Sequence, residues 1–268
     1  MTTLKFAIAG ASGRMGRMLI ETVLNTPDAQ LVGALDIPGS PHLSQDPVAF
    51  LGKTSEIKIT ADIREGLKDA DFLIDFTRPE GTLAHLEAAQ TMGVKMIIGT
   101  TGFNDVQKAT LKKASEKIAI VFAPNMSVGV NATFKLLEVA AKILNSGYDI
   151  EIVEAHHKHK VDAPSGTASR TAELMTQARK DAGLGAMPDA TNSGIAAARG
   201  GNVGDIPVHS IRLRGLIAHQ EVLLGGLGET LTIRHDSIDR AGFMPGVLLG
   251  VRSVVKVPGL THGLDKFM

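Results

Sequence analysis

Gly10-Ala11-Ser12-Gly13-Arg14-Met15-Gly16 directly follows a short apolar run, Leu4 to Ala9, and opens a segment of helical character. This order predicts a buried parallel strand, a glycine turn and a helix, as at the start of a Rossmann fold. Gly10 would make the tight turn, Gly13 would let a pyrophosphate approach the backbone, and Gly16 would let the helix pack on the strand. The spacing is one residue longer than the standard fingerprint, so a glycine turn without a ligand is the alternative.

An acid follows the second predicted strand at the position that a dinucleotide site requires. Asp36 comes directly after Leu31 to Leu35, about 20 residues past the glycines, where a ribose-binding carboxylate belongs. The alternative, a solvated aspartate at a strand end, is weakened by the ordered set of strand, turn, helix, strand and acid. Ile37 occupies the place where enzymes strict for a 2′-phosphate often carry Arg or Lys. The sequence therefore favours NADH, although Arg14 could still reach the 2′-phosphate of NADPH.

Strands and helices keep alternating as far as residue 122, which predicts a doubly wound parallel sheet. Thr77 is expected to cap the helix that carries Pro79 and Glu80. Two strand tips further along, one after residue 98 and one after residue 122, suit a nicotinamide ring, and ordinary turns are the alternative. The residues expected to contact the dinucleotide at these tips are Gly99, Thr100, Thr101, Ala123, Pro124, Asn125 and Met126.

A change in the pattern of apolar and polar residues predicts a second domain of α+β class with an open, mostly antiparallel sheet. Long helices and three short alternating strands follow residue 130, and the 268-residue length suits two domains. We expect residues 1–126 with 237–268 to form the dinucleotide-binding domain. Residues 127–236 would form the domain for substrate binding, catalysis and oligomerisation.

The composition excludes several kinds of protein. The chain has no cysteine, which excludes a disulfide framework, a thiolate zinc site and a cysteine nucleophile. Its 28 basic and 28 acidic residues balance, so charge gives no reason to expect nucleic acid or a membrane surface as a partner. No apolar run reaches the ~20 residues of a membrane span, and none resembles a signal segment. We expect a cytoplasmic protein.

The densest chemistry is in Glu154-Ala155-His156-His157-Lys158-His159-Lys160-Val161-Asp162-Ala163-Pro164-Ser165-Gly166-Thr167. Basic and titratable side chains crowd a strand end, and a helix then begins at Ser165. Its free N–H groups, at Gly166 and Thr167, could hold a carboxylate. Such a loop suits an anionic small molecule, with a histidine as proton donor or acceptor.

Two other readings of this loop are weaker. A metal site is disfavoured, because adjacent histidines on an extended chain point in opposite directions and the lysines would repel a cation. We therefore expect no metal. The remaining alternative is a solvated basic loop without a function.

The same loop closely resembles the signature of the 4-hydroxy-tetrahydrodipicolinate reductases (dihydrodipicolinate reductases) of bacterial lysine and diaminopimelate synthesis. The resemblance covers nearly the whole chain. Besides the glycine turn and the loop, it is carried by DFTRPEGT at 75–82, GTTGF at 99–103, NMSVGVN at 125–131, LRGLIAHQEV at 213–222 and IRHDS at 233–237.

This resemblance implies roles for particular residues. His156 would be the proton donor and acceptor and Lys160 a second proton donor, while His157, Gly166 and Thr167 would hold the carboxylates of a small dicarboxylate substrate. The substrate would lose its 4-hydroxyl as water, take hydride at ring C4 from NADH or NADPH, and take a proton from His156. The family is typically a homotetramer joined through the open sheet of the second domain. Family members often carry a basic residue at the position of Ile37, so strict use of NADPH is in doubt.

Two rival readings keep the Rossmann domain and change the function. Another oxidoreductase of amino-acid metabolism, such as a homoserine dehydrogenase, shares the architecture, but its catalytic lysine motif has no obvious counterpart here. A non-catalytic module that senses the dinucleotide would have no use for the histidine and lysine loop.

Overall fold

The computed structural model describes residues 3–144, 147–255 and 257–268. Residues 1–2, 145–146 and 256, which fall within the predicted domain ranges, lie outside the described residues. The chain divides into two compact units, Met1–Val128 with Phe243–Met268, and Gly129–Gly242. The assignment of the cofactor to the first unit, and of substrate and assembly to the second, stays a prediction.

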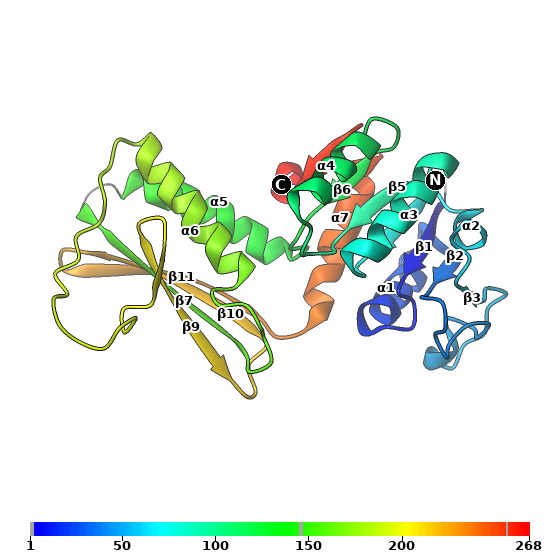
Figure 1. The fold of residues 1–268 in the computed structure, drawn as a ribbon, viewed down its shortest axis with the longest axis horizontal. Coiled ribbons are helices and arrows are strands. Elements are labelled where there is room, and N and C mark those ends of the chain that lie inside the picture. Colours follow the sequence, from blue (N-terminus) through cyan, green and yellow to red (C-terminus); the bar gives the residue numbers. More distant parts are fainter. Residues whose placement is uncertain (1–2, 145–146, 256) are drawn as a thin grey trace. The chain divides into compact units, whose positions relative to one another are not determined.

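The first unit is built on a seven-stranded sheet in which the strands run in the order β12-β6-β5-β4-β1-β2-β3 (Figure 1). All of its strand pairs are parallel. The strands are β1 (Leu4–Ala9), β2 (Ala29–Leu35), β3 (Ile59–Thr60), β4 (Phe72–Asp75), β5 (Lys95–Ile98), β6 (Ile120–Phe122) and β12 (Leu260–His262). The helices are α1 (Arg14–Leu24), α2 (Ile63–Leu67), α3 (Pro79–Met92), α4 (Asp105–Ala114) and α7 (Met244–Val254), with short 3-10 turns η1 (Ala49–Leu51) and η4 (Asp265–Phe267).

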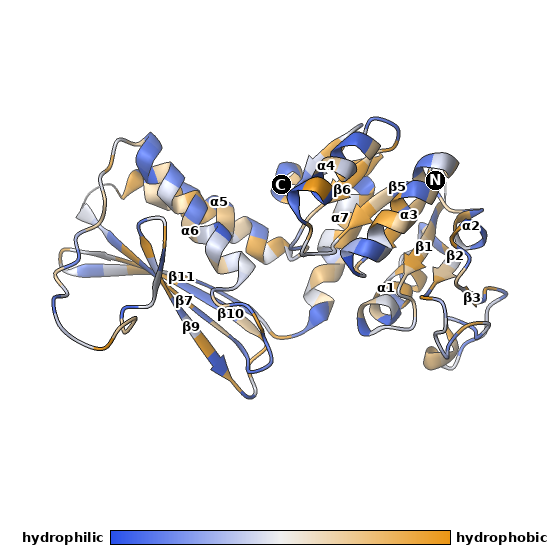
Figure 2. Cartoon of the chain, viewed as in Figure 1, coloured by the Kyte–Doolittle hydropathy of each residue, from blue (hydrophilic) through white to orange (hydrophobic). Residues whose placement is uncertain are grey.

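Helices cover both faces of this sheet because successive side chains of a strand point to opposite faces. Phe6 and Ile8 of β1 pack in one cluster with α1 and α7, whereas Ala7 and Ala9 pack in the other with α2, α3 and α4. Figure 2 accordingly shows hydrophobic colour along the sheet strands and hydrophilic patches on the helices around them. The predicted doubly wound fold is confirmed.

The second unit has a five-stranded sheet in the order β11-β10-β7-β9-β8, mostly antiparallel, with β7 and β9 parallel. Helices α5 and α6 cover one face of the sheet, with the side chains of Leu137 and Met175 among those in the core (Figure 1). The predicted α+β class is confirmed. The elements are α5 (Val128–Ile143), β7 (Asp149–His157), α6 (Gly166–Asp181), β8 (Gly201–Val203), β9 (Ile206–Leu213), β10 (Ala218–Gly226) and β11 (Glu229–Ser237), and η3 (Arg240–Phe243) follows.

Two local expectations were wrong. Thr77 does not cap α3: the N-cap is Arg78, without a side-chain hydrogen bond, and the Thr77 hydroxyl donates instead to the Asp75 carboxylate at 2.6 Å. The Asp75 carboxylate, two residues earlier, takes the hydroxyl hydrogen in a charge-assisted hydrogen bond, and α3 begins one residue too late for Thr77 to be its cap. In addition, the sequence predicts a strand over 149–155 that ends before the histidines, whereas β7 extends to His157, so both adjacent histidines belong to the strand itself.

Among the described residues, every helix is too short or too polar to cross a lipid bilayer.

Candidate functional site

The glycine turn after β1 has the geometry of a phosphate cradle. Gly10 has a positive φ of 68°, and a Cβ atom added to Gly16 would lie 2.1 Å from the Gly10 carbonyl oxygen. Gly13 is the N-cap of α1 and provides no side-chain cap for the N–H groups of the first helical turn. Because such N–H groups and the helix dipole favour an anion, the turn fits the pyrophosphate of a dinucleotide.

Asp36 lies beside this turn, directly after β2. Its carboxylate accepts hydrogen bonds from the hydroxyl of Ser12 and from that of Ser40, and from the backbone N–H of Ile37 at 2.8 Å. The Ser12 contact connects the acid to the glycine turn, so the two predicted parts of the dinucleotide site are adjacent. The Ile37 side chain is 70% exposed and brings no positive charge to this place.

The remaining predicted cofactor residues lie on the same edge of the sheet. Parallel pairing sets β5 beside β4 and β6, and the Ala123 N–H donates to the Ile98 carbonyl at 3.0 Å. The tips carrying Gly99–Thr101 and Ala123–Met126 therefore lie side by side at the carboxyl ends of the strands, where open sheets bind ligands. Ala123 and Met126 are buried in the core, so only their backbone atoms suit a ligand.

In the second unit, β7 places His156 next to a buried carboxylate. Its Nδ1 atom is 2.6 Å from Oε2 of Glu154, a side chain that is fully buried. Two nitrogens of Arg212 donate to Glu154 at 2.7 and 2.8 Å, and the Ser165 N–H donates at 3.1 Å. Burial alone would raise the pKa of Glu154, but the hydrogen bonds from His156 and Arg212 outweigh it and lower that pKa to about 2.

This arrangement determines which ring nitrogen of His156 points a hydrogen at Glu154 and which one is left for a reaction. An ionised carboxylate only accepts hydrogen bonds, so the Nδ1 atom of His156 must carry the hydrogen that faces Glu154. The Nε2 atom is then the ring nitrogen that can give or take a proton in a reaction. The buried pair holds one histidine in one tautomer and one orientation.

His157 is in cationic surroundings. Desolvation and the positive charges of His156, His159, Lys160 and Arg240 lower the pKa of His157. An anionic ligand at this place would face several positive or hydrogen-donating groups, as a carboxylate requires.

Lys160 and the start of α6 share an internal carboxylate. The Lys160 Nζ atom is 2.7 Å from an oxygen of Asp162, which also accepts from the Gly166 N–H. Burial raises the pKa of Asp162, but these two contacts outweigh it and lower that pKa. Ser165 caps α6 by accepting from the Ala168 N–H at 3.2 Å. Lys160 and the Gly166 N–H, both predicted to act on the substrate, thus bind the carboxylate of Asp162 in the chain itself.

Two family models match nearly the whole chain. One, described as the N-terminus of dihydrodipicolinate reductase, matches residues 4–126, and one described as its C-terminus matches residues 129–268. The chain belongs to the dihydrodipicolinate reductase family. It is therefore an oxidoreductase that uses a pyridine nucleotide, in lysine and diaminopimelate biosynthesis.

Individual relatives agree. The 4-hydroxy-tetrahydrodipicolinate reductase of Cupriavidus taiwanensis is 52% identical over 260 residues, which cover 95% of each chain. That of Burkholderia multivorans is 54% identical over 259 residues, with 93% of each chain covered. A solved structure, dipicolinate-bound dihydrodipicolinate reductase from Paenisporosarcina sp. TG-14, aligns over 100% of both chains with a TM-score of 0.83 and 32% identity.

The residue-level predictions missed two charged residues near the histidines, Arg212 and Arg240, and gave Glu154 no role. Arg212 holds Glu154 and also donates to the Asp162 carbonyl at 2.7 Å, while Arg240 contributes positive charge at His157. One sequence signal pointed to Glu154: it continues the inward-facing series of Ile150 and Ile152 on β7, where a charged side chain needs a buried partner. No comparable local signal marks Arg212 as its partner.

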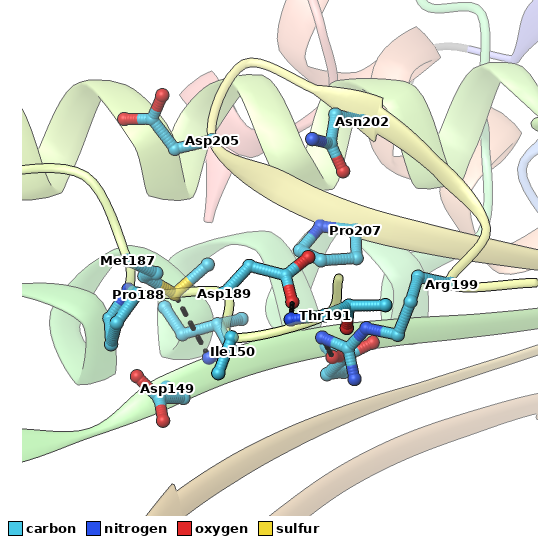
Figure 3. Close-up of a pocket in the computed structure, with 12 residues that line it drawn as sticks. Asp149, Ile150, Met187, Pro188, Asp189, Thr191, Arg199, Asn202, Asp205 and Pro207 are labelled. Atoms are coloured by element: carbon cyan, nitrogen blue, oxygen red, sulfur yellow. Dashed lines mark hydrogen bonds and ion pairs between the residues drawn. The ribbon is translucent and has the colours of Figure 1, made fainter. Parts of the chain in front are cut away.

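A separate pocket of about 480 Å³ lies away from the histidines in the second unit (Figure 3). Its lining includes the carboxylates of Asp149, Glu151, Asp189 and Asp205 together with Arg199, and Arg199 pairs with Glu151. This excess of negative charge would repel a dicarboxylate. This pocket is therefore a poor site for a dicarboxylate.

Proposed function

We propose that the chain reduces 4-hydroxy-tetrahydrodipicolinate to tetrahydrodipicolinate, consuming a reduced pyridine nucleotide and a proton and releasing water. The observation that carries the proposal is the buried Glu154–His156 pair at the entrance to a cationic loop. The Paenisporosarcina relative is described as binding dipicolinate, a ring with two carboxylates. The binding domains are proposed to be residues 1–126 with 237–268 for the cofactor and 127–236 for the substrate.

His156 is the proposed proton donor and acceptor. When bound, the reduced nicotinamide supplies the hydride. Reduction of a conjugated imine leaves an electron-rich ring that must take up one proton, and the His156 Nε2 atom can give it because Glu154 holds Nδ1. Glu154 also stabilises the protonated ring before transfer, since an ionised carboxylate faces it. Lys160 is the second proposed proton donor.

The proposed carboxylate-binding groups are His157, Gly166 and Thr167. The first two N–H groups of α6 point toward the helix N-terminus, where the dipole favours negative charge. In the structure, the Asp162 carboxylate binds the Gly166 N–H and the Lys160 ammonium group. A substrate carboxylate would take over these same contacts.

The decisive experiment follows NADH oxidation with freshly generated 4-hydroxy-tetrahydrodipicolinate, using aspartate semialdehyde as the control substrate. Rapid oxidation with the first and none with the second supports the proposal. Turnover of aspartate semialdehyde would indicate another Rossmann oxidoreductase, and dinucleotide binding without any turnover would indicate a sensing module. A cytoplasmic location, where NADH and NADPH are supplied, belongs to the same proposal.

NADH is proposed to serve at least as well as NADPH. Asp36 would accept hydrogen bonds from the adenosine ribose, and the exposed apolar Ile37 offers a 2′-phosphate nothing. Steady-state kcat/KM values with the two cofactors are expected to be equal or to favour NADH. A strong preference for NADPH would contradict this assignment and point to Arg14.

Changing Ile37 to arginine is expected to raise kcat/KM for NADPH roughly tenfold or more, because a guanidinium forms charge-assisted hydrogen bonds to a phosphate. The value for NADH should change little, since NADH lacks the phosphate. Ile37→Gln is the matched control, with a long polar side chain and no charge. An equal gain in both variants would show that the effect is not electrostatic.

A homotetramer joined through the open face of the second sheet is also proposed. This face carries apolar side chains such as Ile211, 46% exposed, and Leu213, 57% exposed. Ion pairs accompany them, among them Arg234 with Glu221 and with Asp236. Such a mixture of apolar and paired charged groups is typical of an interface between copies of one chain.

Ile211→Arg is expected to dissociate the assembly, because four copies of an unpaired charge would be buried in the interface. Light scattering coupled to size-exclusion chromatography should give four times the 28.2 kDa chain mass for the wild type and a smaller mass for the variant. Val106→Arg, at a 76% exposed position of α4, is the control and should remain tetrameric. A monomeric wild type would refute the proposed assembly.

A further inference from the structure

The first unit contains a buried acid that the proposed chemistry does not use. Asp75 ends β4 and is fully buried. Its Oδ2 atom lies 2.8 Å from Nδ1 of His85 on α3. Its Oδ1 atom accepts from the N–H and the hydroxyl of Thr77, at 2.9 and 2.6 Å, and from the hydroxyl of Thr100 at 3.3 Å. One carboxylate therefore connects the ends of β4 and β5 to α3.

This carboxylate also fixes the direction of the surrounding hydrogen bonds. Because ionised Asp75 only accepts, the Thr77 hydroxyl and the Nδ1 atom of His85 each point a hydrogen toward it. The Thr100 hydroxyl lies 2.9 Å from that of Thr82, 3.3 Å from Oδ1 of Asp75 and 3.4 Å from the Asp75 carbonyl oxygen. Burial would raise the pKa of Asp75, but the hydrogen bonds from His85 and Thr77 outweigh it and lower that pKa. The charged carboxylate thus fixes the orientation of Thr77 and His85 and brings Thr100 into the same network.

The network lies directly beneath the edge of the first sheet that is proposed to bind the cofactor. Thr100 is one of the proposed cofactor residues, and it is 2% exposed. A Cβ atom added to Gly10 of the phosphate turn would lie 3.1 Å from the Thr77 methyl carbon, and one added to Gly81 of α3 would lie 3.2 Å from the Thr77 hydroxyl. Thr77 therefore packs closely against both the phosphate turn and α3.

We propose that Asp75 and His85 are positioning residues that hold the tips of β4 and β5 in the shape that receives the nicotinamide half of the dinucleotide. This inference rests on the proposed placement of the cofactor. A buried Asp–His pair is a costly way to fasten a helix to a sheet, because apolar packing would do so without desolvating an ion. The pair instead orients polar groups at a ligand-binding edge. It acts through Thr77 and Thr100 and does not touch the reacting atoms.

The test compares two ligands that share the adenine half. Asp75→Asn keeps the shape of the side chain but replaces charge-assisted hydrogen bonds with weaker ones and directs a donor at His85. Calorimetry is expected to show NADH binding weakened roughly tenfold or more, with ADP-ribose, which lacks the nicotinamide, within about twofold of wild type. Equal weakening of both ligands, or of neither, would overturn the proposal.

Further variants separate positioning from general loss of stability. Leu86→Val alters a buried neighbour on α3 and leaves the network intact, so it should bind both ligands as the wild type does. His85→Asn retains a donor at the Nδ1 position and should keep most of the NADH affinity, whereas His85→Ala should lose it. If Asp75→Asn does not fold, the comparison of His85→Asn with His85→Ala tests the proposal. Equal NADH binding by these two variants would overturn it.

Failure of the proposed function would look different. It would appear in the wild type, as absence of NADH binding or of oxidation with 4-hydroxy-tetrahydrodipicolinate. A wild type that binds and oxidises NADH, together with Asp75 and His85 variants that bind it equally well, would refute the positioning role alone.

Discussion

Replacing His156 with alanine is expected to lower kcat by about 10²–10⁴-fold, the range that general acid–base catalysis typically contributes. The KM for the substrate should change little, because His156, held by the Glu154 carboxylate, is proposed to carry a proton and not to bind a substrate carboxylate. His157→Ala should mainly raise KM, since it removes binding that the ground state and transition state share. Steady-state kinetics of both variants measure this difference.

Lys160→Ala should affect both constants, because Lys160 is charged and already binds a carboxylate, that of Asp162. Binding of NADH, measured directly, should survive in all three variants, since the proposed dinucleotide residues belong to the first unit. Near-normal turnover by His156→Ala with none by His157→Ala would reverse the two assignments. Loss of NADH binding in all three would make the loop structural or cofactor-binding.

Glu154→Gln is expected to reduce both stability and turnover. It gives the Arg212 guanidinium a neutral amide in place of a carboxylate, and it replaces the acceptor-only group that fixes the His156 tautomer with one that can also donate. Turnover should fall by roughly two orders of magnitude, because an amide can face either tautomer of the ring. The free energy of unfolding at pH 7 should fall by about 3 kcal/mol, the value for a carboxyl group with a pKa of about 2 in place of 4.5.

The stability loss should depend on pH with a definite sign. A lowered pKa in the folded state stabilises the protein above the unfolded pKa, and this contribution is lost as the pH falls toward 2. Urea unfolding should therefore show the difference between wild type and Glu154→Gln shrinking between pH 5 and pH 2. Glu151→Gln is the matched control on β7, at a partly exposed pair, and should cost under about 1 kcal/mol. A constant Glu154→Gln difference across that range would contradict the account of the buried pair.

Much of the fold was predictable because local pattern and burial agree. The run Leu4–Ala9 is apolar apart from Lys5, is buried on both faces from Phe6 onward and ends at a glycine, as expected of a central parallel strand followed by a tight turn. Strand β12 was missed, since Leu260–His262 is too short to show periodicity and is defined by its pairing with β6. Residues 186–205 are rich in Gly, Ala and Asn, a composition that predicts an irregular segment, yet they contain β8, which likewise exists only through its pairing with β9.

The site was predictable to the extent that its residues are consecutive. His156, His157 and Lys160 stand together in the sequence, so their chemistry could be recognised there. The partner of Glu154 is Arg212, 58 residues away, and folding alone brings the two together. Thr77 shows that a local pattern can also mislead: threonine is a favoured cap, but the N-cap of α3 is Arg78, and the Thr77 hydroxyl donates to Asp75.

The position of Asp162 has a consequence for ligand selection. Its carboxylate, tethered two residues from Lys160, competes with any incoming anion for Lys160 and the Gly166 N–H at a high local concentration. If the loop binds the substrate as proposed, one carboxylate would be exchanged for another, and the attraction gained at these two groups would be nearly cancelled by the attraction given up. A ligand with a single carboxylate would gain little from the exchange. One with a second carboxylate would make further contacts near His157 that Asp162 does not make, so the loop would discriminate by the number of carboxylates and not by charge alone.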